Sequence, residues 1–325
     1  MLAMSRKKFS WLAAGAIIAL TLVPLGAGAQ VKGLDILVPA NPGGGWDQTA
    51  RAMETALQAN DLASGIQVTN VGGAGGTIGL AQFATTSKNK GNAILVGGLV
   101  MVGAILTNKS PVTLDNVKPL ARLTGEYEVL VVPASSPIQN LGDLVSKLKA
   151  DPGSVSWGGG SAGGTDHIVA GLIAKAVGAD ASKVNYIAHA GGGEALSSIL
   201  GGHVTVGISG YEEFAGQIQA GQLRAIGITA DERVAGIDVP TLKEQGVDVS
   251  LVNWRGLFAA PKISDANLTK LSDMVAKMVE TKEWQQVLTD RKWMGLFLPH
   301  EEFAAFLKED QAKVASTLQE IGLVK

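Results

Sequence analysis

The sequence predicts an α/β fold of two domains, with mainly parallel sheets and a ligand cleft between the domains. Short apolar runs of strand length alternate with runs of helix length along most of the chain. This alternation is typical of parallel sheets that helices cover on both faces. A chain of 325 residues is long enough for two such domains. Four glycine-rich segments fall at the ends of predicted strands, the edge at which open α/β sheets bind ligands.

The N-terminus has the pattern of a secretory signal peptide. Basic residues at 6–8 precede an apolar run at 11–25 and an Ala-Gly-Ala site at 27–29. A retained membrane anchor is the alternative, but the run is short and Pro24 interrupts it. We therefore expect residues 1–29 to be a signal peptide cleaved after Ala29, and the rest of the chain to reside in the periplasm.

Composition excludes several classes of function. The chain has no cysteine, which removes disulfides and the residue that a bacterial lipoprotein would acylate. Its formal net charge of −2 gives no electrostatic attraction to nucleic acid. The four histidines show no spacing of metal ligands, so we expect no metal and no cofactor. Any attraction for an anion must then be local.

The first third of the chain alternates strands with helices. Ala50, Met53 and Leu57 recur at helical spacing and indicate one buried helix face. The expected elements are strands at 34–38, 66–70 and 93–96, with helices at 47–57 and 77–84.

The middle of the chain repeats this order after a loop region that contains Pro111 and Pro119. A strong strand is expected at 129–132, and the Asp-Pro-Gly segment at 151–153 predicts a turn. We expect helices at 141–149, 165–177 and 194–200, strands at 155–157, 184–187, 204–208 and 223–228, and a mostly helical tail at 266–279 and 299–321.

The four glycine-rich segments lie at 41–47, 71–77, 157–165 and 191–194. Glycine adopts positive φ and lets the backbone approach a ligand closely. A helix that starts behind such a segment presents free N–H groups and a partial positive charge. Several of these loops in one cleft would form a site for a small anion.

Five segments carry a resemblance to a known family. They are 38–47 with Arg51, 70–79, 160–167, 191–196 and 200–204. In this order they resemble the tripartite tricarboxylate transporter substrate-binding family, the periplasmic receptors related to the Bug proteins. The resemblance covers essentially the whole chain after the signal peptide.

The resemblance implies a two-lobed periplasmic-binding-protein fold of type II-like organisation, hinged, with the ligand in the interdomain cleft. Lobe 1 would comprise 30–131 plus 252–325, and lobe 2 would comprise 132–251. It further implies a receptor, expected to be a monomer, that captures a di- or tricarboxylate of the citrate type. The receptor would deliver this ligand to the membrane subunits of the transporter. A sensor that presents the ligand to a signalling receptor is a second non-enzymatic interpretation.

Family members hold a carboxylate with the first loop and with the loop around Ser161. This chain departs from the usual pattern at Asn41, Trp46 and Thr205, which would alter the acid that fits. The predicted ligand-binding residues are Asn41, Gly43, Gly44, Gly45, Trp46, Gly75, Gly76, Ser161, Ala162, Gly163, Gly164, Thr165, His167, Ser209 and Tyr211.

Several of these side chains have an alternative structural interpretation. Trp46 fits a core position as well as a cleft wall, and a protonated His167 would add a charge-assisted bond only if it faced the cleft. Asp47 is expected to be a helix N-cap. Arg255 could belong to a surface pair or bind a second carboxylate with both nitrogens. The acidic pair at 212–213 is expected on a solvated face.

Two glycine-containing patterns in the chain also match motifs of enzymes. Gly158, Gly160 and Gly163 match a dinucleotide-binding fingerprint, but no acidic residue ends the following strand. The segment 159–163 also matches G-x-S-x-G, which would make Ser161 a hydrolase nucleophile. Chain order would then require a later acid and histidine, such as Asp248 and His300.

Overall fold

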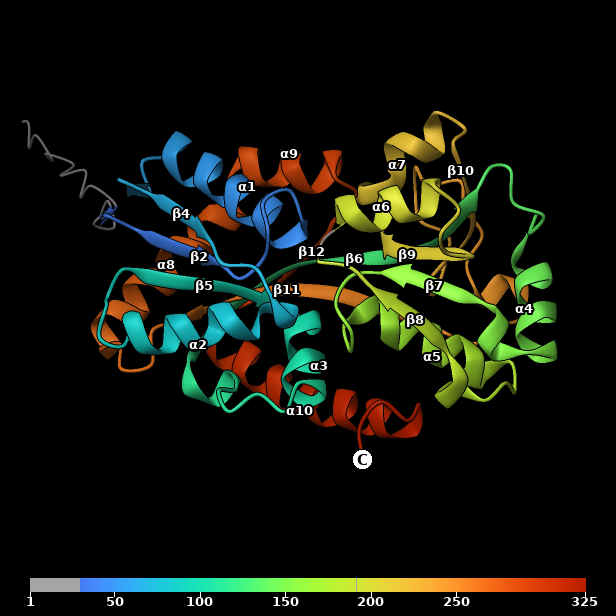
Figure 1. Ribbon diagram of the computed structural model, residues 1–325. Coiled ribbons are helices and arrows are strands. Elements are labelled where there is room, and N and C mark those ends of the chain that lie inside the picture. Colours follow the sequence, from blue (N-terminus) through green and yellow to red (C-terminus); the bar gives the residue numbers. More distant parts are fainter. Residues whose placement is uncertain (1–29, 191) are drawn as a thin grey trace, which may run out of the picture.

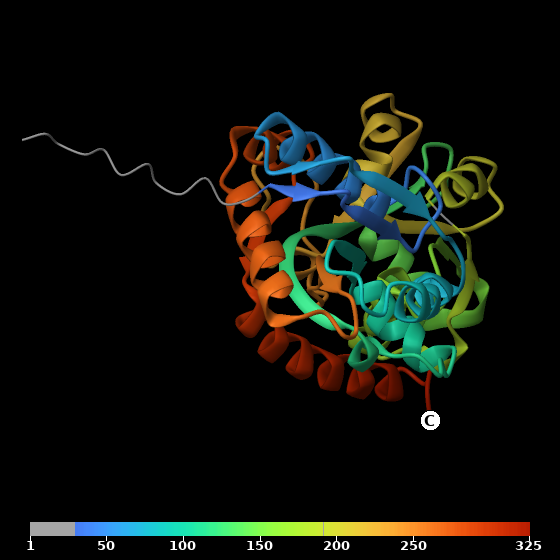
Figure 2. The ribbon, with the colours of Figure 1, turned by 90° about the vertical axis from the view of Figure 1, so that its left-hand side faces the viewer.

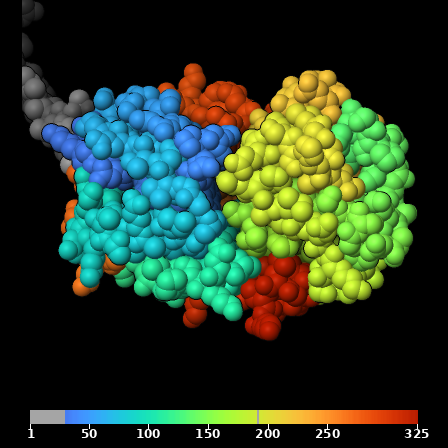
Figure 3. Space-filling view, in the orientation of Figure 1, coloured from blue at the N-terminus to red at the C-terminus, as the bar shows by residue number. Residues whose placement is uncertain are grey.

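Two lobes lie side by side in this computed structural model, which describes residues 30–190 and 192–325 (Figure 1). The predicted signal peptide and Gly191 lie outside the described residues. One mixed sheet runs through both lobes, with the strand order β4-β2-β5-β11-β6-β9-β7-β8. The two lobes meet along a visible seam on the molecular surface (Figure 3).

The first lobe is built around three parallel strands. β2 (Asp35–Val38) pairs in parallel with both β4 (Gln67–Asn70) and β5 (Ala93–Gly98). The first-lobe helices are α1 (Gly45–Ala59), α2 (Thr77–Thr86), α3 (Leu99–Thr107), α8 (Asp265–Val279), α9 (Lys282–Asp290) and α10 (His300–Glu320). The C-terminal helices cover one outer side of the molecule (Figure 2). A short pair, β1 (Val31–Lys32) and β3 (Ala63–Ser64), lies apart from the main sheet.

The second lobe repeats this parallel arrangement. β7 (Ser156–Gly159) pairs in parallel with β8 (Asn185–Ala188) and β9 (Val206–Gly210). The helices of this lobe are α4 (Leu141–Ala150), α5 (Thr165–Ala176), α6 (Gly192–Leu200) and α7 (Tyr211–Gln219). Each strand is followed by a helix, as the alternating sequence pattern predicts.

Two strands cross between the lobes. β6 (Lys118–Pro133) runs through the middle of the sheet, and β11 (Val252–Ala259) pairs with it antiparallel. β10 (Leu223–Ile228) and β12 (Met294–Leu298) also pair antiparallel with β6. The sheet is therefore mixed rather than mainly parallel. The expected loop around Pro119 is wrong, because this proline is the second residue of β6, a position near a strand end that tolerates proline.

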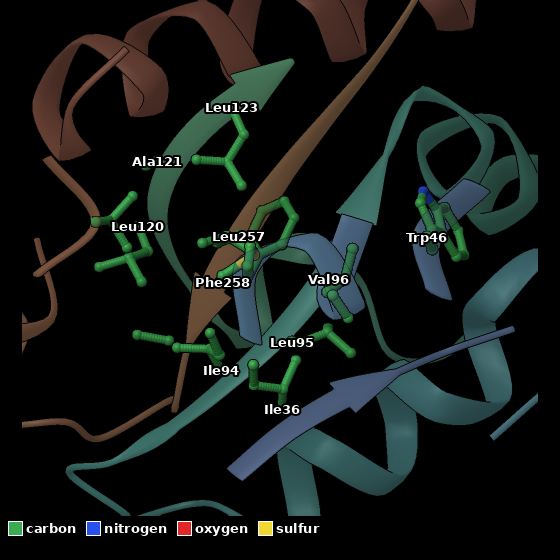
Figure 4. Close-up of a cluster of buried hydrophobic side chains, with 14 of the residues drawn as sticks. Ile36, Trp46, Ile94, Leu95, Val96, Leu120, Ala121, Leu123, Leu257 and Phe258 are labelled. Atoms are coloured by element: carbon green, nitrogen blue, oxygen red, sulfur yellow. The ribbon is translucent and has the colours of Figure 1, made fainter. Parts of the chain in front are cut away.

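Each lobe has its own apolar core. In the first lobe Ile36, Ile94, Leu95, Leu257 and Phe258 come from neighbouring strands and are fully or almost fully buried (Figure 4). In the second lobe two clusters cover the opposite faces of the sheet and include Leu130, Val132 and Val129, Val131 from β6. Alternate residues of β6 thus point into different clusters, as expected for a central strand.

Several elements are missing from the predicted order, among them α3, α7, α9, β11 and β12. α3 is apolar almost all round, so its sequence shows no helical periodicity, and its buried positions explain why. α9 and β12 lie between the two segments of the tail that are predicted to be helical. Within the described ranges, no helix combines the length and the apolar character that crossing a membrane requires.

Candidate ligand-binding site

A cavity of ≈ 340 Å³ lies where the lobes meet. Its lining includes Gly44 and Gly76 from the first lobe and Gly160 and Gly192 from the second. All four glycine-rich segments therefore contribute to one cavity. Each segment follows a strand of the sheet, so the cavity sits at the strand ends of both lobes.

The first glycine loop is built to expose the start of α1. Gly43 has φ +90°, and its N–H donates to Asp47 Oδ2 at 2.9 Å. Gly44 is the N-cap, and the first helical bond runs from Gln48 N–H to the carbonyl of Gly44 at 2.9 Å. The N–H groups of 45–47 precede that bond and have no intrahelical acceptor. Asp47 is thus the third helical residue, and the prediction that it is the N-cap is wrong.

The glycine-rich segment at 157–165 has the same construction in the second lobe. Gly163 has φ +75°, and its N–H donates to His167 Nδ1 at 3.2 Å. Gly164 is the N-cap of α5, and Ile168 N–H donates to its carbonyl at 3.0 Å. In both loops a glycine with positive φ precedes a glycine N-cap, and the third helical side chain accepts the first glycine's N–H. Two helix N-termini from opposite lobes therefore border one cavity, which favours an anion there.

His167 stabilises the loop before α5 and is uncharged. Burial lowers the pKa of His167 to about 4. Its ring stacks on Tyr186 with centroids 4.2 Å apart, and Nδ1 accepts the Gly163 N–H. The imidazole is therefore neutral at pH 7 and carries its proton on Nε2. It supports the loop and supplies no cation to the cavity.

Arg255 supplies a buried cation at the cavity wall. It lies on β11 with its side chain 3% exposed and forms an ion pair with Glu126 of β6. Its guanidinium carbon lies 4.6 Å from the ring centre of Trp293. A Cβ at Gly45 would overlap the guanidinium, so Arg255 lies directly against the start of α1. Of the two interpretations of Arg255, the surface pair is wrong, because the residue is buried and pairs with Glu126 across the neighbouring strands β11 and β6.

Acidic side chains also approach the cavity, which the sequence pattern did not indicate. Asp166 and Glu213 line it, and Glu128 lies fully buried behind it. Burial raises the pKa of Asp166 and Glu213, the latter to about 7, and raises that of Glu128 well above its usual range. The expected solvated position of Glu213 is therefore wrong. Its place in the first turn of α7, directly after β9 and Gly210, was the available signal.

Comparison with known proteins shows the family to which this chain belongs. Residues 49–323 match the family described as the tripartite tricarboxylate transporter family receptor. The chain belongs to this family. A relative from Cupriavidus necator, named as a UPF0065 protein in the gbd 5' region, is 27% identical over 96% of both chains.

Two solved structures share the fold. The periplasmic binding protein BugD has a TM-score of 0.81 and 21% identity, over 90% of this chain and 99% of that one. MatC from Rhodopseudomonas palustris, solved with bound malate, has a TM-score of 0.78 and 22% identity, over 89% and 99%. The protein is a solute-binding receptor with the two-lobed fold of periplasmic binding proteins, and it is not an enzyme.

Most of the predicted site residues lie on the cavity wall of this receptor. The lining contains Gly44, Gly45, Trp46, Gly75, Gly76, Ser161, Ala162, Gly164, Thr165 and Ser209. The wall also contains polar residues that the sequence pattern did not select, namely Asp166, His189, Glu213 and Asn253.

Five predicted residues lie outside that lining. The N–H groups of Gly43 and Gly163 are directed at Asp47 and His167, and His167 packs on Tyr186. The remaining two residues are Asn41, an exposed residue whose side chain abuts Gly72, and Tyr211, which is half-buried at the start of α7.

The residues required by the hydrolase alternative are not assembled. Within residues 30–190 and 192–325, Ser161 Oγ has no hydrogen bond to a histidine. His300 starts α10 in the first lobe, where Nδ1 lies 2.5 Å from the carbonyl oxygen of Pro119. In the same part of the chain, no group of three or more His, Asp or Glu side chains could hold a metal ion.

Proposed function

We propose that this receptor captures a di- or tricarboxylate in the periplasm and delivers it to the membrane subunits of a tripartite tricarboxylate transporter. The observation that carries the proposal is the pair of helix N-termini at one cavity. α1 and α5 each present N–H groups without intrahelical acceptors from opposite lobes. Two carboxylates of one ligand can then bind one lobe each.

Ser161 extends this anion site on the second lobe. It lines the cavity, and its hydroxyl can donate a hydrogen bond to a carboxylate oxygen, whereas the Thr165 hydroxyl already donates to Asp166 at 3.1 Å. The malate bound to MatC, a protein of the same fold, is a dicarboxylate of suitable size for such a cavity. Citrate is the larger candidate that the sequence resemblance suggests.

We further propose that ligand binding closes the lobes about the hinge strands. The proposed division assigns 30–131 and 252–325 to lobe 1 and 132–251 to lobe 2, with the end of β6, from Val129 on, packing in the cores of lobe 2. β6 and β11 are the strands that cross between these parts. Closure of two lobes over a ligand at such crossings is a common binding mechanism. Export depends on the signal peptide at 1–29, which we propose is removed after Ala29.

The test is thermal unfolding of the protein without residues 1–29, against citrate, malate, succinate and adipate, with acetate as a monocarboxylate control. Ligand at about 100 times its Kd stabilises the folded state by about 2.7 kcal/mol. We expect a di- or tricarboxylate to raise the Tm and acetate to have little effect. Equal shifts with acetate, or no shift with any of the acids, would contradict the proposal.

A further inference from the structure

Carboxyl groups outnumber cations around the base of the cavity. Glu126 and Glu128 come from β6, Asp166 from α5 and Glu213 from α7, whereas Arg255 of β11 is the cation among them. An ionised dicarboxylate that entered this cavity would meet these carboxyls. The anion site therefore contains a repulsive element that the helix N-termini alone do not explain.

Three of the four carboxyls either bind groups of the protein itself or lie outside the cavity lining. Glu126 pairs with Arg255 and accepts the Trp293 indole N–H at 3.2 Å. Asp166 accepts the Gly160 N–H at 2.6 Å and the Thr165 hydroxyl at 3.1 Å. Glu128 is fully buried and is not part of the cavity lining.

Glu213 is the carboxyl placed to meet the ligand. It lines the cavity next to Gly192 at the start of α6, where an added Cβ would overlap its Oε2. Groups facing it are Glu126 of β6, Asp166 of α5, Arg255 of β11 and Ser209 of β9. Burial is the largest influence and raises the pKa of Glu213 to about 7. Glu213 therefore exchanges a proton near neutral pH.

Two buried polar atoms of the cavity wall also lack partners. Within residues 30–190 and 192–325, Arg255 Nη1 and Asn253 Oδ1 have none, although both residues line the cavity and are at least nine-tenths buried. One atom is a donor and the other an acceptor, on alternate residues of β11. A ligand carboxylate in this part of the cavity can accept hydrogen bonds from Arg255 Nη1 and from the protonated carboxyl of Glu213.

We propose that Glu213 is a specificity-determining residue that binds one carboxylate of the ligand through a shared proton. The site therefore takes up the dicarboxylate together with one proton from solvent. The second carboxylate of the ligand remains ionised at the helix N-termini. This inference rests on the proposed function and adds to it the protonation state in which the acid is bound.

Binding through a shared proton determines how the affinity for the acid depends on pH. Below about pH 6.5 Glu213 already carries the proton, so the affinity changes little with pH. Above about pH 7.5 the proton must be taken up on binding, and affinity falls about tenfold for each pH unit. The second carboxyl of malate, succinate and adipate ionises above the usual carboxyl pKa of about 4, because the first carboxylate is already charged, so the pH dependence above about pH 7.5, where the acids are fully ionised, is the part that reports Glu213.

The experiment is isothermal titration calorimetry with malate, succinate and adipate in turn, from about pH 6 to about pH 8.5. At the highest pH, heats measured in buffers of different ionisation enthalpy give the number of protons taken up, which we expect to be one. Glu213→Gln replaces the titrating carboxyl with a neutral donor. Its affinity should equal that of the unaltered protein at low pH and should not fall as the pH rises.

Two control variants isolate Glu213 from its neighbours. Glu212→Gln removes the same charge from the same turn of α7 at a residue outside the cavity lining. His189→Gln replaces the histidine of the cavity wall. Both should retain the pH dependence. If His189→Gln abolishes it, or if Glu213→Gln keeps it, the proposal is wrong.

The remaining outcomes separate this inference from the proposed function. If an acid binds but takes up no proton even at the highest pH, the shared proton is overturned and the receptor function stands. If no acid binds at any pH, the proposed function itself fails. If Glu213→Gln folds by circular dichroism but binds weakly at every pH, Glu213 acts as a charged acceptor, for example toward an ammonium group. That outcome would also overturn the shared proton.

Discussion

A single methyl group at Gly103 should hold the lobes apart. Gly103 lies in α3 of the first lobe, and a Cβ there would overlap the carbonyl oxygen of Gly163 in the second lobe. That neighbour is backbone, held by the hydrogen bond from Gly163 N–H to His167. Overpacking of this kind costs about 1–3 kcal/mol. If only the closed form bears that cost, Gly103→Ala raises the Kd for the acid by about 5- to 150-fold.

The same substitution should not weaken the unliganded fold. Replacing glycine with alanine inside a helix stabilises it by about 0.5–1 kcal/mol. Gly216→Ala in α7 is the matched control, because no heavy atom lies within 4 Å of an added Cβ there. Calorimetry gives the Kd, and urea unfolding without ligand gives the free energy of unfolding. An unchanged Kd in Gly103→Ala, or a loss of more than about 1 kcal/mol without ligand, would refute closure across this contact.

Three further predictions follow from the site. Ser161→Ala should weaken acid binding in a calorimetric titration by about tenfold without lowering the Tm of the free protein, since it removes one donor to an anion. Arg255→Met leaves Glu126 buried without its cation and should cost about 3–5 kcal/mol in urea unfolding. A loss below about 1 kcal/mol would contradict the account. Glu213 has a pKa raised from 4.5 to about 7, so its stabilising contribution is present below the lower value and lost as the pH rises through the higher one. Glu213→Gln should therefore be more stable than the unaltered protein to urea in alkaline solution, and a lower stability there would exclude the burial argument.

Local patterns predicted the strand, loop and helix order well. Hydrophobic spacing and glycine clusters are properties of short segments, and α1 and α5 begin directly after the glycine runs that were singled out. The tandem glycines at 43–44 and 163–164 also predicted exposed helix starts. These features need no knowledge of distant contacts, which is why the sequence showed them.

Features that depend on contacts between distant parts of the chain were not predicted, because no local sequence pattern indicates them. The pair of Glu126 and Arg255 joins residues 129 positions apart, and nothing near either residue indicates its partner. Glu213 resembled a surface residue because it is acidic and directly follows another glutamate. Its side chain is half-buried, against charged groups of β6, α5 and β11 that the fold brings near it. Charge at the base of the cavity is therefore a property of the tertiary structure.

The central claim is that one ligand bridges the helix N-termini of both lobes. A crystal structure of the protein with malate tests it most directly. The account predicts carboxylate oxygens within about 3 Å of backbone nitrogens at the starts of both α1 and α5. A ligand that contacts only one of these helices, or that binds away from the cavity between the lobes, would contradict it.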